Sequence, residues 1–268
     1  ACRTDGVTTV VDLLNLDALG DDRFLAHNPD EDRRRVFGGQ VVAQALMAAT
    51  GTIEADHLVH SLHAYFLRAG SMAQPIEMAV ERLRTGRQVS ARRVTALQEG
   101  KAILILSASF HQPGGQGEFH VTGPTGVPGP EHGLPRTRHS NRYGIEALDA
   151  SFDQPTGTGR RLWFRSTDDL GDDPALHRAV VAYQTDHGPF GSARRVVDAS
   201  VGGFDDMFRA SLDHAIWFHR PFRADDWLLH DIDAISYHGD RILTNAGVYD
   251  AKNRRVATVT QEILARAS

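Results

Sequence analysis

The sequence predicts an α+β protein made of two similar halves, each a long helix wrapped by an antiparallel sheet. Three observations lead to this prediction. In the first half of the 268-residue chain, an alanine-rich apolar run precedes four strand-like runs. A stretch rich in glycine and proline then interrupts the pattern. Beyond it, a second helical run precedes a further set of strand-like runs. At this length, two halves of roughly 110–150 residues can each bury a core.

The first half opens with a short amphipathic helix at residues 8–18, where Val11 and Leu14 share one side behind a threonine cap. Residues 36–50, VFGGQVVAQALMAAT, predict a second helix that two glycines open. This helix is apolar on all sides, so we expect it to be buried. Short glycine-containing turns then join four strands into an antiparallel meander. The strands are expected at 58–67, 75–83, 88–96 and 102–111.

Residues 113–135 separate the two halves. They contain seven glycines and five prolines without apolar periodicity, which predicts a linker. The second half begins with a strand at 160–166 and a helix at 174–186 that has proline at its start. Further strands are expected near 213–219, 227–236, 241–249 and 255–264. We therefore divide the chain into an N-terminal half at 1–112, a linker at 113–160 and a C-terminal half at 161–268.

The two halves are related by a weak internal repeat. A shift of 152 positions superposes SLHAYFLRAG (61–70) on DHAIWFHRPF (213–222) and matches Arg68 with Arg220. A shift of 153 matches Ile103 with Val256 farther along the chain. Because the elements also occur in the same order, the repeat predicts a double hotdog fold. In this fold, two helix-wrapped antiparallel sheets form an internal pseudo-dimer.

Composition and charge exclude several classes of protein. Apolar residues make up 41% and charged residues 24%, as in ordinary globular chains. The net charge of −5 disfavours a nucleic-acid partner, which needs clustered positive charge. No apolar run is long enough for a membrane span, and the first thirty residues lack a signal-peptide pattern, so we expect no membrane insertion and no secretion. One cysteine, Cys2, favours a reducing, cytoplasmic location.

Several segments together carry a family resemblance. They are VFGGQVVAQAL (36–46), HSLHAYFLRAG (60–70), VERLRTGRQVSARRV (80–94) and DHAIWFHRPFRADDWLL (213–229). In this order they resemble the acyl-CoA thioesterase II family, the TesB-like double-hotdog enzymes. The resemblance implies hydrolysis of fatty acyl-CoA to free acid and CoA without a cofactor. It also implies that an Asp, a Ser or Thr, and a Gln in the second half hold and activate water.

The resemblance assigns three catalytic residues. The Asp of the DHxxWFHRPF segment is Asp213, and the Gln of TVTQEI (258–263) is Gln261. Ser236 is the best match for the hydroxyl residue, although Ile235 and Tyr237 flank it where the family has Ser and Thr. In YQTD (183–186), Asp186 matches the family's YxSD-like segment while Thr185 departs from it. A carboxylate can take a proton from water, and a hydroxyl and an amide can orient that water.

The opening of the long helix at Gly38-Gly39-Gln40 is the candidate substrate-binding element. Free backbone N–H groups at a positive helix end suit the oxyanion that forms from a thioester carbonyl. We therefore select Gly39 and Gln40 as substrate-binding residues. The alternative is that the glycines only let the helix approach the sheet, and the sequence favours neither.

Other motifs that would carry chemistry are missing or do not fit. The chain has no G-x-S-x-G elbow, no GxGxxG and no P-loop. His57, His60 and His63 do not share one face of a strand, so no metal site is expected. The arginines at 84, 87, 92 and 93 fit a solvated strand face and are left out of the site.

Two other functions remain as alternatives. A hotdog enoyl-CoA hydratase would need a D-x-N-P-x-H pattern, which the residues after Asp213 do not match. A non-catalytic acyl-CoA binding or sensing module is the other alternative. We also expect a homo-oligomer, because hotdog sheets leave faces and edges that pair between chains.

The internal repeat aligns Asp213 with Ser61 and Gln261 with Ala108, and brings Ser236 near Leu83. It therefore predicts one catalytic site per chain, in the second half.

Overall fold

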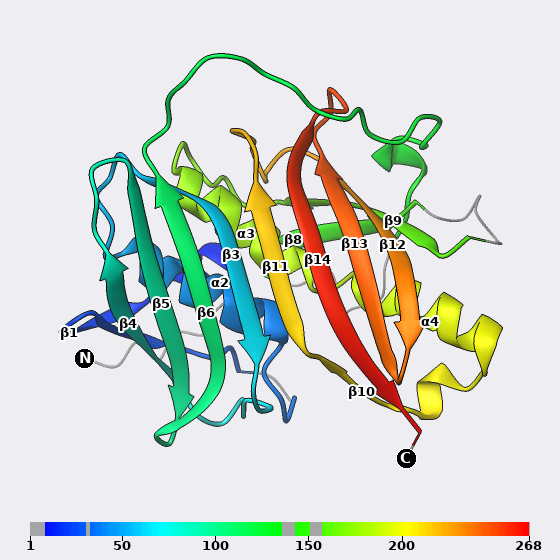
Figure 1. The fold of residues 1–268 in the computed structure, drawn as a ribbon, viewed down its shortest axis with the longest axis horizontal. Helices are drawn as coiled ribbons and strands as arrows, with labels where there is room; N and C mark the ends of the chain where they lie inside the picture. Colours follow the sequence, from blue (N-terminus) through cyan, green and yellow to red (C-terminus); the bar gives the residue numbers. More distant parts are fainter. Residues whose placement is uncertain (1–8, 31–32, 136–142, 151–156, 268) are drawn as a thin grey trace.

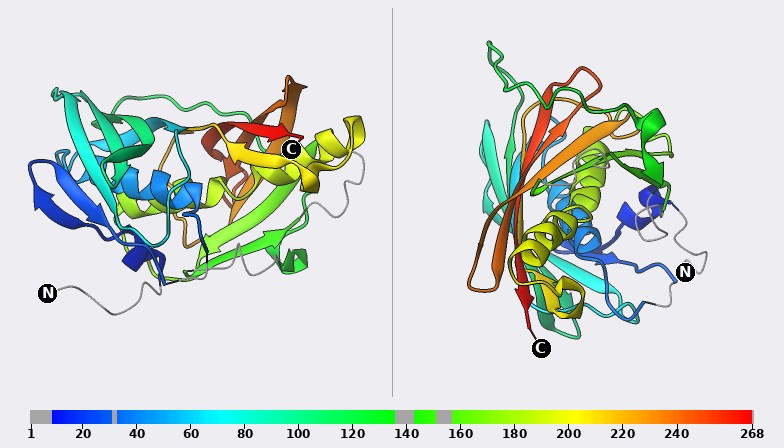
Figure 2. Two further views of the ribbon diagram at one scale, coloured as in Figure 1. Left: turned by 90° about the horizontal axis from the view of Figure 1, so that it is seen from below. Right: turned by 90° about the vertical axis from the view of Figure 1, so that its right-hand side faces the viewer.

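The computed structural model describes residues 9–30, 33–135, 143–150 and 157–267. Its strands form one antiparallel sheet of 14 strands, and β3 of the first half pairs with β11 of the second half at the centre. The helices lie against one face of this sheet, and the other face is open (Figures 1 and 2). The strand order is β1-β2-β4-β5-β6-β3-β11-β14-β13-β12-β9-β8-β7, with β10 on β14.

The first half follows the predicted order of elements. A capping box between Thr9 and Asp12 starts its first helix, as the threonine-rich opening predicts. The predicted meander is present, and two short strands precede the long helix. The elements are α1 (Val10–Leu14), β1 (Asp17–Gly20), β2 (Arg23–Ala26), α2 (Gly38–Thr50), β3 (Leu58–Phe66), β4 (Ile76–Arg84), β5 (Val89–Gln98) and β6 (Lys101–His111).

The second half repeats the order of long helix and four-stranded meander, with a second helix, a 3-10 helix and a short strand inserted between them. Asp173 caps the predicted helix, and Pro174 occupies its first turn. The elements are η1, a 3-10 helix (Pro130–His132), β7 (Leu134–Pro135), β8 (Ile145–Asp149), β9 (Gly159–Ser166), α3 (Pro174–Thr185), α4 (Pro189–Ser200), η2 (Phe204–Asp206), β10 (Phe208–Ser211), β11 (Asp213–Phe218), β12 (Leu228–His238), β13 (Arg241–Tyr249) and β14 (Arg255–Arg266).

Strand register confirms the internal repeat. The β4–β5 pair changes register between Arg82 and Arg84, and the β12–β13 pair changes register between Ala234 and Ser236, each 152 positions later. Even this irregularity is therefore duplicated. At the centre, His63 of β3 pairs with Ala215 of β11, its own counterpart under the same shift. The chain is thus a double hotdog whose two sheets are joined edge to edge.

One core spans both halves. The central helices α2 and α3 lie side by side across the same face of the sheet (Figure 2). The alanines and valines of α2 are buried on nearly every side, as its apolar composition predicts. Helix α4 packs on β12, β13 and β14 over a smaller apolar cluster. Together the helices position their ends against the inner face of the sheet.

The predicted linker at 113–160 is only partly a connection. Residues 113–129 contain no helix or strand, and this stretch crosses the end of the sheet (Figure 1). Within the same range, however, β8 pairs with β9 and extends the sheet of the second half. Residues 136–142 and 151–156 lie outside the described residues. We propose that the second repeat begins at β8, before the boundary at 161 that composition predicts.

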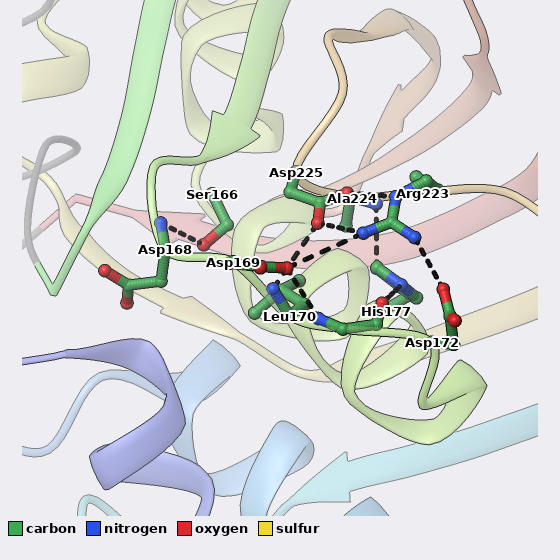
Figure 3. A network of polar contacts seen from close by, with 10 residues as sticks. Ser166, Asp168, Asp169, Leu170, Asp172, His177, Arg223, Ala224 and Asp225 are labelled. Atoms are coloured by element: carbon green, nitrogen blue, oxygen red, sulfur yellow. Dashed lines mark hydrogen bonds and ion pairs between the residues drawn. The ribbon is translucent and has the colours of Figure 1, made fainter.

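Polar contacts fix the loop between β11 and β12 to the start of α3 (Figure 3). Arg223 donates Nε to Asp225 Oδ1 at 2.9 Å and Nη1 to Asp172 at 3.0 Å. His177 of α3 bridges the backbone at Gly171 and Ala224 through its two ring nitrogens. Hydrogen bonds to these carboxylates raise the pKa of Arg223. The loop therefore holds the start of α3 in place, and with it the direction of the whole helix.

Candidate active site

A cavity of about 640 Å³ lies between the two halves, at the start of α2. Its polar lining includes Asp186 and Ser211, and arginines gather among its other lining residues at positions 33, 35, 68 and 209. The rest of the wall is mostly apolar, which is typical of a site for a small organic ligand. The apolar side chains belong to Val36, Phe37, Val41, Phe66, Leu67, Ile103, Leu104, Phe190, Phe208, Leu212 and Leu264.

Three polar side chains converge where the cavity meets the inner face of the sheet. Gln261 Nε2 donates to Asp186 Oδ1 at 2.7 Å and to Ser211 Oγ at 2.7 Å. Ser211 Oγ in turn donates to Asp186 Oδ1 at 3.2 Å. Gln261 is fully buried and Asp186 nearly so. A carboxylate, a hydroxyl and an amide therefore form one connected cluster beside an apolar cavity.

The ends of two helices place Asp186. It is the C-cap residue of α3, and its Oδ2 accepts the backbone N–H of Gly39 at 2.8 Å, in the first turn of α2. A Cβ atom on Gly38 would lie 2.7 Å from Asp186 Oδ2, and a Cβ atom on Gly39 would collide with the carbonyl of Tyr183. The two glycines therefore allow α2 to approach the end of α3 closely enough to bind the carboxylate.

Gln261 is held from behind by His214. The two residues are fully buried, and His214 Nδ1 lies 2.8 Å from Gln261 Oε1. Because the amide nitrogen of Gln261 already donates to Asp186 and Ser211, its oxygen accepts the proton on His214 Nδ1. Thr185 Oγ1 lies 3.1 Å from the other ring nitrogen. This chain of contacts fixes the orientation of the Gln261 amide.

Burial shifts the ionisation of the two titratable groups. Desolvation raises the pKa of Asp186, although His214, Gln261, Gly39 and Ser211 each lower it in part. Desolvation also lowers the pKa of His214, against the opposing effect of Asp186. The cluster therefore combines a neutral imidazole with a carboxyl group of increased basicity. Such a carboxylate suits proton transfer from water near neutral pH.

The structure brings only one of the three expected catalytic residues into this cluster. Gln261 faces inward with Val259 and Ile263, as strand alternation predicts. Asp213 faces the opposite side, where it accepts the backbone N–H of Glu262 at 2.7 Å and lies 3.0 Å from His63 Nε2. The carboxylate of this cluster is therefore that of Asp186 and not that of Asp213.

Ser236 also lies outside the cluster. It is an exposed residue of β12 paired with Leu243, whereas the next residue, Tyr237, packs on the inner apolar cluster. The hydroxyl of the cluster is that of Ser211, which comes two residues before Asp213. A register shift explains its direction, because β10 and β11 pair with β14 one residue out of step. This shift lets Ser211 and His214 both face inward.

The helix opening contributes in a different way from the one expected. The Gly39 N–H holds the carboxylate of Asp186, and so acts on the cluster. The Gln40 side chain is buried and donates to Asn28 Oδ1 at 2.9 Å, away from the cavity lining.

Within the described ranges, no group of three His, Cys, Asp or Glu residues is arranged to hold a metal ion. No helix in those ranges has the length and apolar character of a membrane span.

Comparison with known families identifies both halves. A model described as the acyl-CoA thioesterase N-terminal domain matches residues 28–111. A second model, described as the acyl-CoA thioesterase C-terminal domain, matches residues 113–265. Together these matches cover most of the chain and contain every residue of the polar cluster.

Relatives align along nearly the whole chain. Acyl-coenzyme A thioesterase 8 of Mus musculus is 34% identical over 282 residues, which cover 94% of this chain and 87% of the relative. Acyl-CoA thioesterase 2 of Haemophilus influenzae is 32% identical and covers 99% of each. The solved structure of acyl-CoA thioesterase II TesB2 from Mycobacterium marinum superposes with a TM-score of 0.85 at 33% identity. It covers 97% of this chain and 99% of its own.

Proposed function

The chain belongs to the acyl-CoA thioesterase II family and hydrolyses acyl-CoA to a free acid and CoA, and from this premise we propose that Asp186, Ser211 and Gln261 carry out the hydrolysis. One observation carries the proposal. Asp186 and Ser211 line the apolar cavity, and the buried Gln261 joins them through hydrogen bonds of 2.7 Å. Water held there faces Asp186 as an acceptor for its proton and the Ser211 hydroxyl, which fixes its direction.

In the proposed reaction, Asp186 acts as the general base. Ser211 orients a water molecule, Gln261 holds the Ser211 hydroxyl and the Asp186 carboxylate in place, Asp186 accepts one proton of the water, and the water oxygen forms a bond to the thioester carbon. The tetrahedral intermediate then collapses, and its C–S bond breaks. The proton held by Asp186 passes to the departing sulfur, so the products are a carboxylic acid and the CoA thiol. No covalent enzyme intermediate is needed.

The start of α2 supports this chemistry electrostatically. Its N-terminal turn is the positive end of a 13-residue helix and contacts Asp186 through Gly39. The same field favours the ionised carboxylate and the negative charge that develops on the thioester oxygen. Gly38 lines the cavity at this helix end and, having no Cβ, lets Asp186 and Phe66 pack against the first turn of α2.

The cavity lining suggests how the substrate lies. The apolar wall suits an acyl chain, because burial of each CH₂ contributes about 0.8 kcal/mol. The arginines at 33, 35, 68 and 209 suit the phosphates of CoA. We propose that the acyl chain occupies the apolar part while the phosphates lie against these arginines.

Paired serine variants test the catalytic assignment. Ser211→Ala removes the hydroxyl within the cluster, so we expect kcat for acyl-CoA hydrolysis to fall roughly 10–100-fold. Ser236→Ala is the matched control and should stay within about twofold of the parent chain. Release of free thiol reports both rates. If Ser236→Ala loses activity and Ser211→Ala keeps it, the assignment expected from sequence replaces this one.

We further propose a homo-oligomer that uses the open face of the sheet. Tyr65 on β3 and Trp217 on β11 are 49% and 44% exposed beside the central strand pair. Large exposed aromatic side chains are typical of interfaces between chains. Trp217→Glu should lower the mass measured by light scattering. An unchanged mass would remove this face as the interface.

A cytoplasmic location is also proposed. It rests on the cysteine count, because a single cysteine cannot form an internal disulfide bond. Cell fractionation tests the location. Recovery of the protein with a reducing compartment supports the proposal, and recovery outside the cell contradicts it.

A further inference from the structure

A second cavity, of about 740 Å³, lies at the other end of the central strand pair. It is bounded by the loop after β11, by the start of β14 and by the segment that crosses the end of the sheet (Figure 1). The lining residues of these elements are His219, Arg220, Pro221, Arg254 and Arg255, with Gly117, Glu118, Phe119 and His120 from the crossing segment. None of them contacts the catalytic cluster.

The internal repeat relates this cavity to the rim of the active site. Arg68 at the active-site rim donates Nη1 to the carbonyl of Ala102 at 2.7 Å. Its counterpart, Arg220, donates Nη1 to the carbonyl of Arg255 at 2.8 Å. Since Arg255 lies 153 positions after Ala102, the same hydrogen bond occurs twice. The second cavity is therefore the symmetric counterpart of the rim where we place the CoA phosphates.

Catalytic groups are missing from this counterpart, but positive charge is present. The positions equivalent to Ser211 and Gln261 hold Val59 and Ala108. At the rim, Arg255 takes the place of Ala102. The counterpart can therefore bind a ligand with the same charge as CoA, but it lacks the groups needed to hydrolyse one.

The guanidinium of Arg255 lacks a carboxylate partner within the described part of the chain. Its Nη2 donates to the Tyr249 hydroxyl at 2.5 Å and its Nη1 to Thr258 Oγ1 at 3.3 Å, so each terminal nitrogen keeps a second N–H without a partner there, whereas Nε is buried. Arg220 lies 3.5 Å from Glu118 on the crossing segment. A partly buried cation is stabilised when a charge-assisted acceptor reaches it. The cavity therefore has unused capacity for an anion.

An exposed aromatic ring completes the cavity. Phe119 is 88% exposed and lies in its lining. A phenyl ring of this kind can stack on the face of a nucleotide base. The volume also falls in the usual range for a bound small molecule. Positive charge and an aromatic ring in one cavity suit a phosphorylated nucleoside better than a fatty acid or a metal ion.

We propose that this cavity is a second, non-catalytic site for the phosphorylated adenosine part of CoA. The phosphates contact Arg220 and Arg255, and the base lies against Phe119. Each chain then binds two CoA molecules, one at the active site and one at the counterpart. The proposal depends on the cavity and its charges, so it can fail while the hydrolytic assignment stands.

Equilibrium binding of desulfo-CoA, which has no thiol, tests the proposal. The parent chain should bind two molecules. Arg255→Met should weaken one of the two sites by roughly tenfold or more and leave kcat/KM for acyl-CoA unchanged, because Arg255 is remote from the catalytic cluster. Arg68→Met is the matched control and should weaken the other site. A single site in the parent chain, or two unchanged sites in Arg255→Met, would overturn the proposal.

A second variant guards against misfolding as the cause of lost binding. Glu118→Gln removes the carboxylate beside Arg220, so it should tighten the second site by about two- to fivefold at low salt. A folding defect cannot produce this gain. Phe119→Ala should weaken binding of desulfo-CoA and of ADP but not of inorganic phosphate. If inorganic phosphate binds the parent chain as tightly as ADP does, the nucleotide assignment is wrong and the cavity is a general anion site.

Discussion

The catalytic cluster and its counterpart in the first half share one scaffold but differ at three inward positions. In the second half these positions hold Ser211 and Gln261 of the cluster and Thr244, whose Oγ1 donates to the Gln261 carbonyl at 3.1 Å. The repeat replaces them with Val59, Ala108 and Arg92. The strand registers that carry both sets are the same, because Thr244 pairs with Gln261 as Arg92 pairs with Ala108, and a register shift follows both Ser211 and Val59. The fold therefore provides two equivalent places, and side chains decide which of them can activate water.

Arg92 has a structural role in the counterpart, which lacks the catalytic side chains. It is almost completely buried and lies beside Ala108 on β5 and β6. Its Nε donates to Thr52 Oγ1 at 2.8 Å and its Nη2 to the Thr52 carbonyl at 2.9 Å, just beyond the end of α2. At the matching end of α3, Asp186 meets Gln261 instead. The C-terminal end of α2 thus contacts the side chain of Arg92, whereas the C-terminal end of α3 carries the Asp186 carboxylate beside the cavity.

Among the variants that compare the catalytic cluster with its counterpart, substitutions at Gln261 and Ala108 should show the largest difference in kcat. Gln261→Ala removes the donor to both Asp186 and Ser211, so we expect kcat to fall roughly 10²–10³-fold. Ala108→Gln is the matched change in the counterpart and should give no gain in rate. Steady-state hydrolysis measures both. Equal losses in the two variants would contradict a single active site.

Loss of Arg92 should affect stability and leave chemistry intact. Arg92→Met keeps much of the volume but leaves the backbone acceptors at Thr52 and Arg84 without their donor. We expect the free energy of unfolding to fall by roughly 2–4 kcal/mol. Denaturant titration measures this loss, and kcat should stay within about twofold. A selective loss of kcat would show that the counterpart takes part in catalysis.

The contact from His214 predicts a positioning effect. His214→Phe removes the donor to Gln261 Oε1, so kcat should fall roughly tenfold through a misdirected amide. His214→Asn retains an N–H donor and should recover part of the rate. The comparison of kcat between these two variants separates positioning from loss of packing. No recovery in His214→Asn would show that His214 only fills space.

The pH profile should report the raised pKa of Asp186. The base works only when ionised, so activity falls as pH decreases through that pKa. Burial raises the pKa above the ordinary value for Asp, and the fall should therefore begin at a higher pH than for an exposed carboxyl. The measurement is kcat/KM against pH for the free enzyme. A rate that stays constant down to about pH 4 would exclude Asp186 as the base.

Sequence alone predicted the scaffold well because alternation and periodicity are local properties. The strands of both meanders lie within a few residues of their expected positions. Gln261 was identified because TVTQEI (258–263) resembles the family's final-strand segment, and its burial beside inward-facing Val259 and Ile263 agrees with strand alternation. The run of arginines at 84, 87, 92 and 93 predicted a solvated strand face, which is wrong for Arg92 because its side chain is buried. The arginine is buried because Thr52 supplies its acceptors.

The remaining site residues depend on features that no local pattern encodes. Ser211 faces inward only because β10 and β11 are out of register on β14. Asp186 matched a family segment, yet its position beside Gln261 arises where the end of α3 meets the start of α2 and the sheet. Strand β8 lies beyond the glycine- and proline-rich stretch at 113–135 but inside the range assigned to the linker, because no strand was expected between residues 113 and 160. Each of these features is set by tertiary contacts.

The central claim is that the carboxylate of Asp186, and not that of Asp213, activates water. Hydrolysis of acyl-CoA by Asp186→Asn and Asp213→Asn tests it most directly, with circular dichroism to verify that both variants fold. The account predicts that Asp186→Asn lowers kcat by roughly 10²–10⁴, whereas Asp213→Asn stays within a few-fold of the parent chain. A near-normal rate in Asp186→Asn together with a large loss in Asp213→Asn would contradict the account.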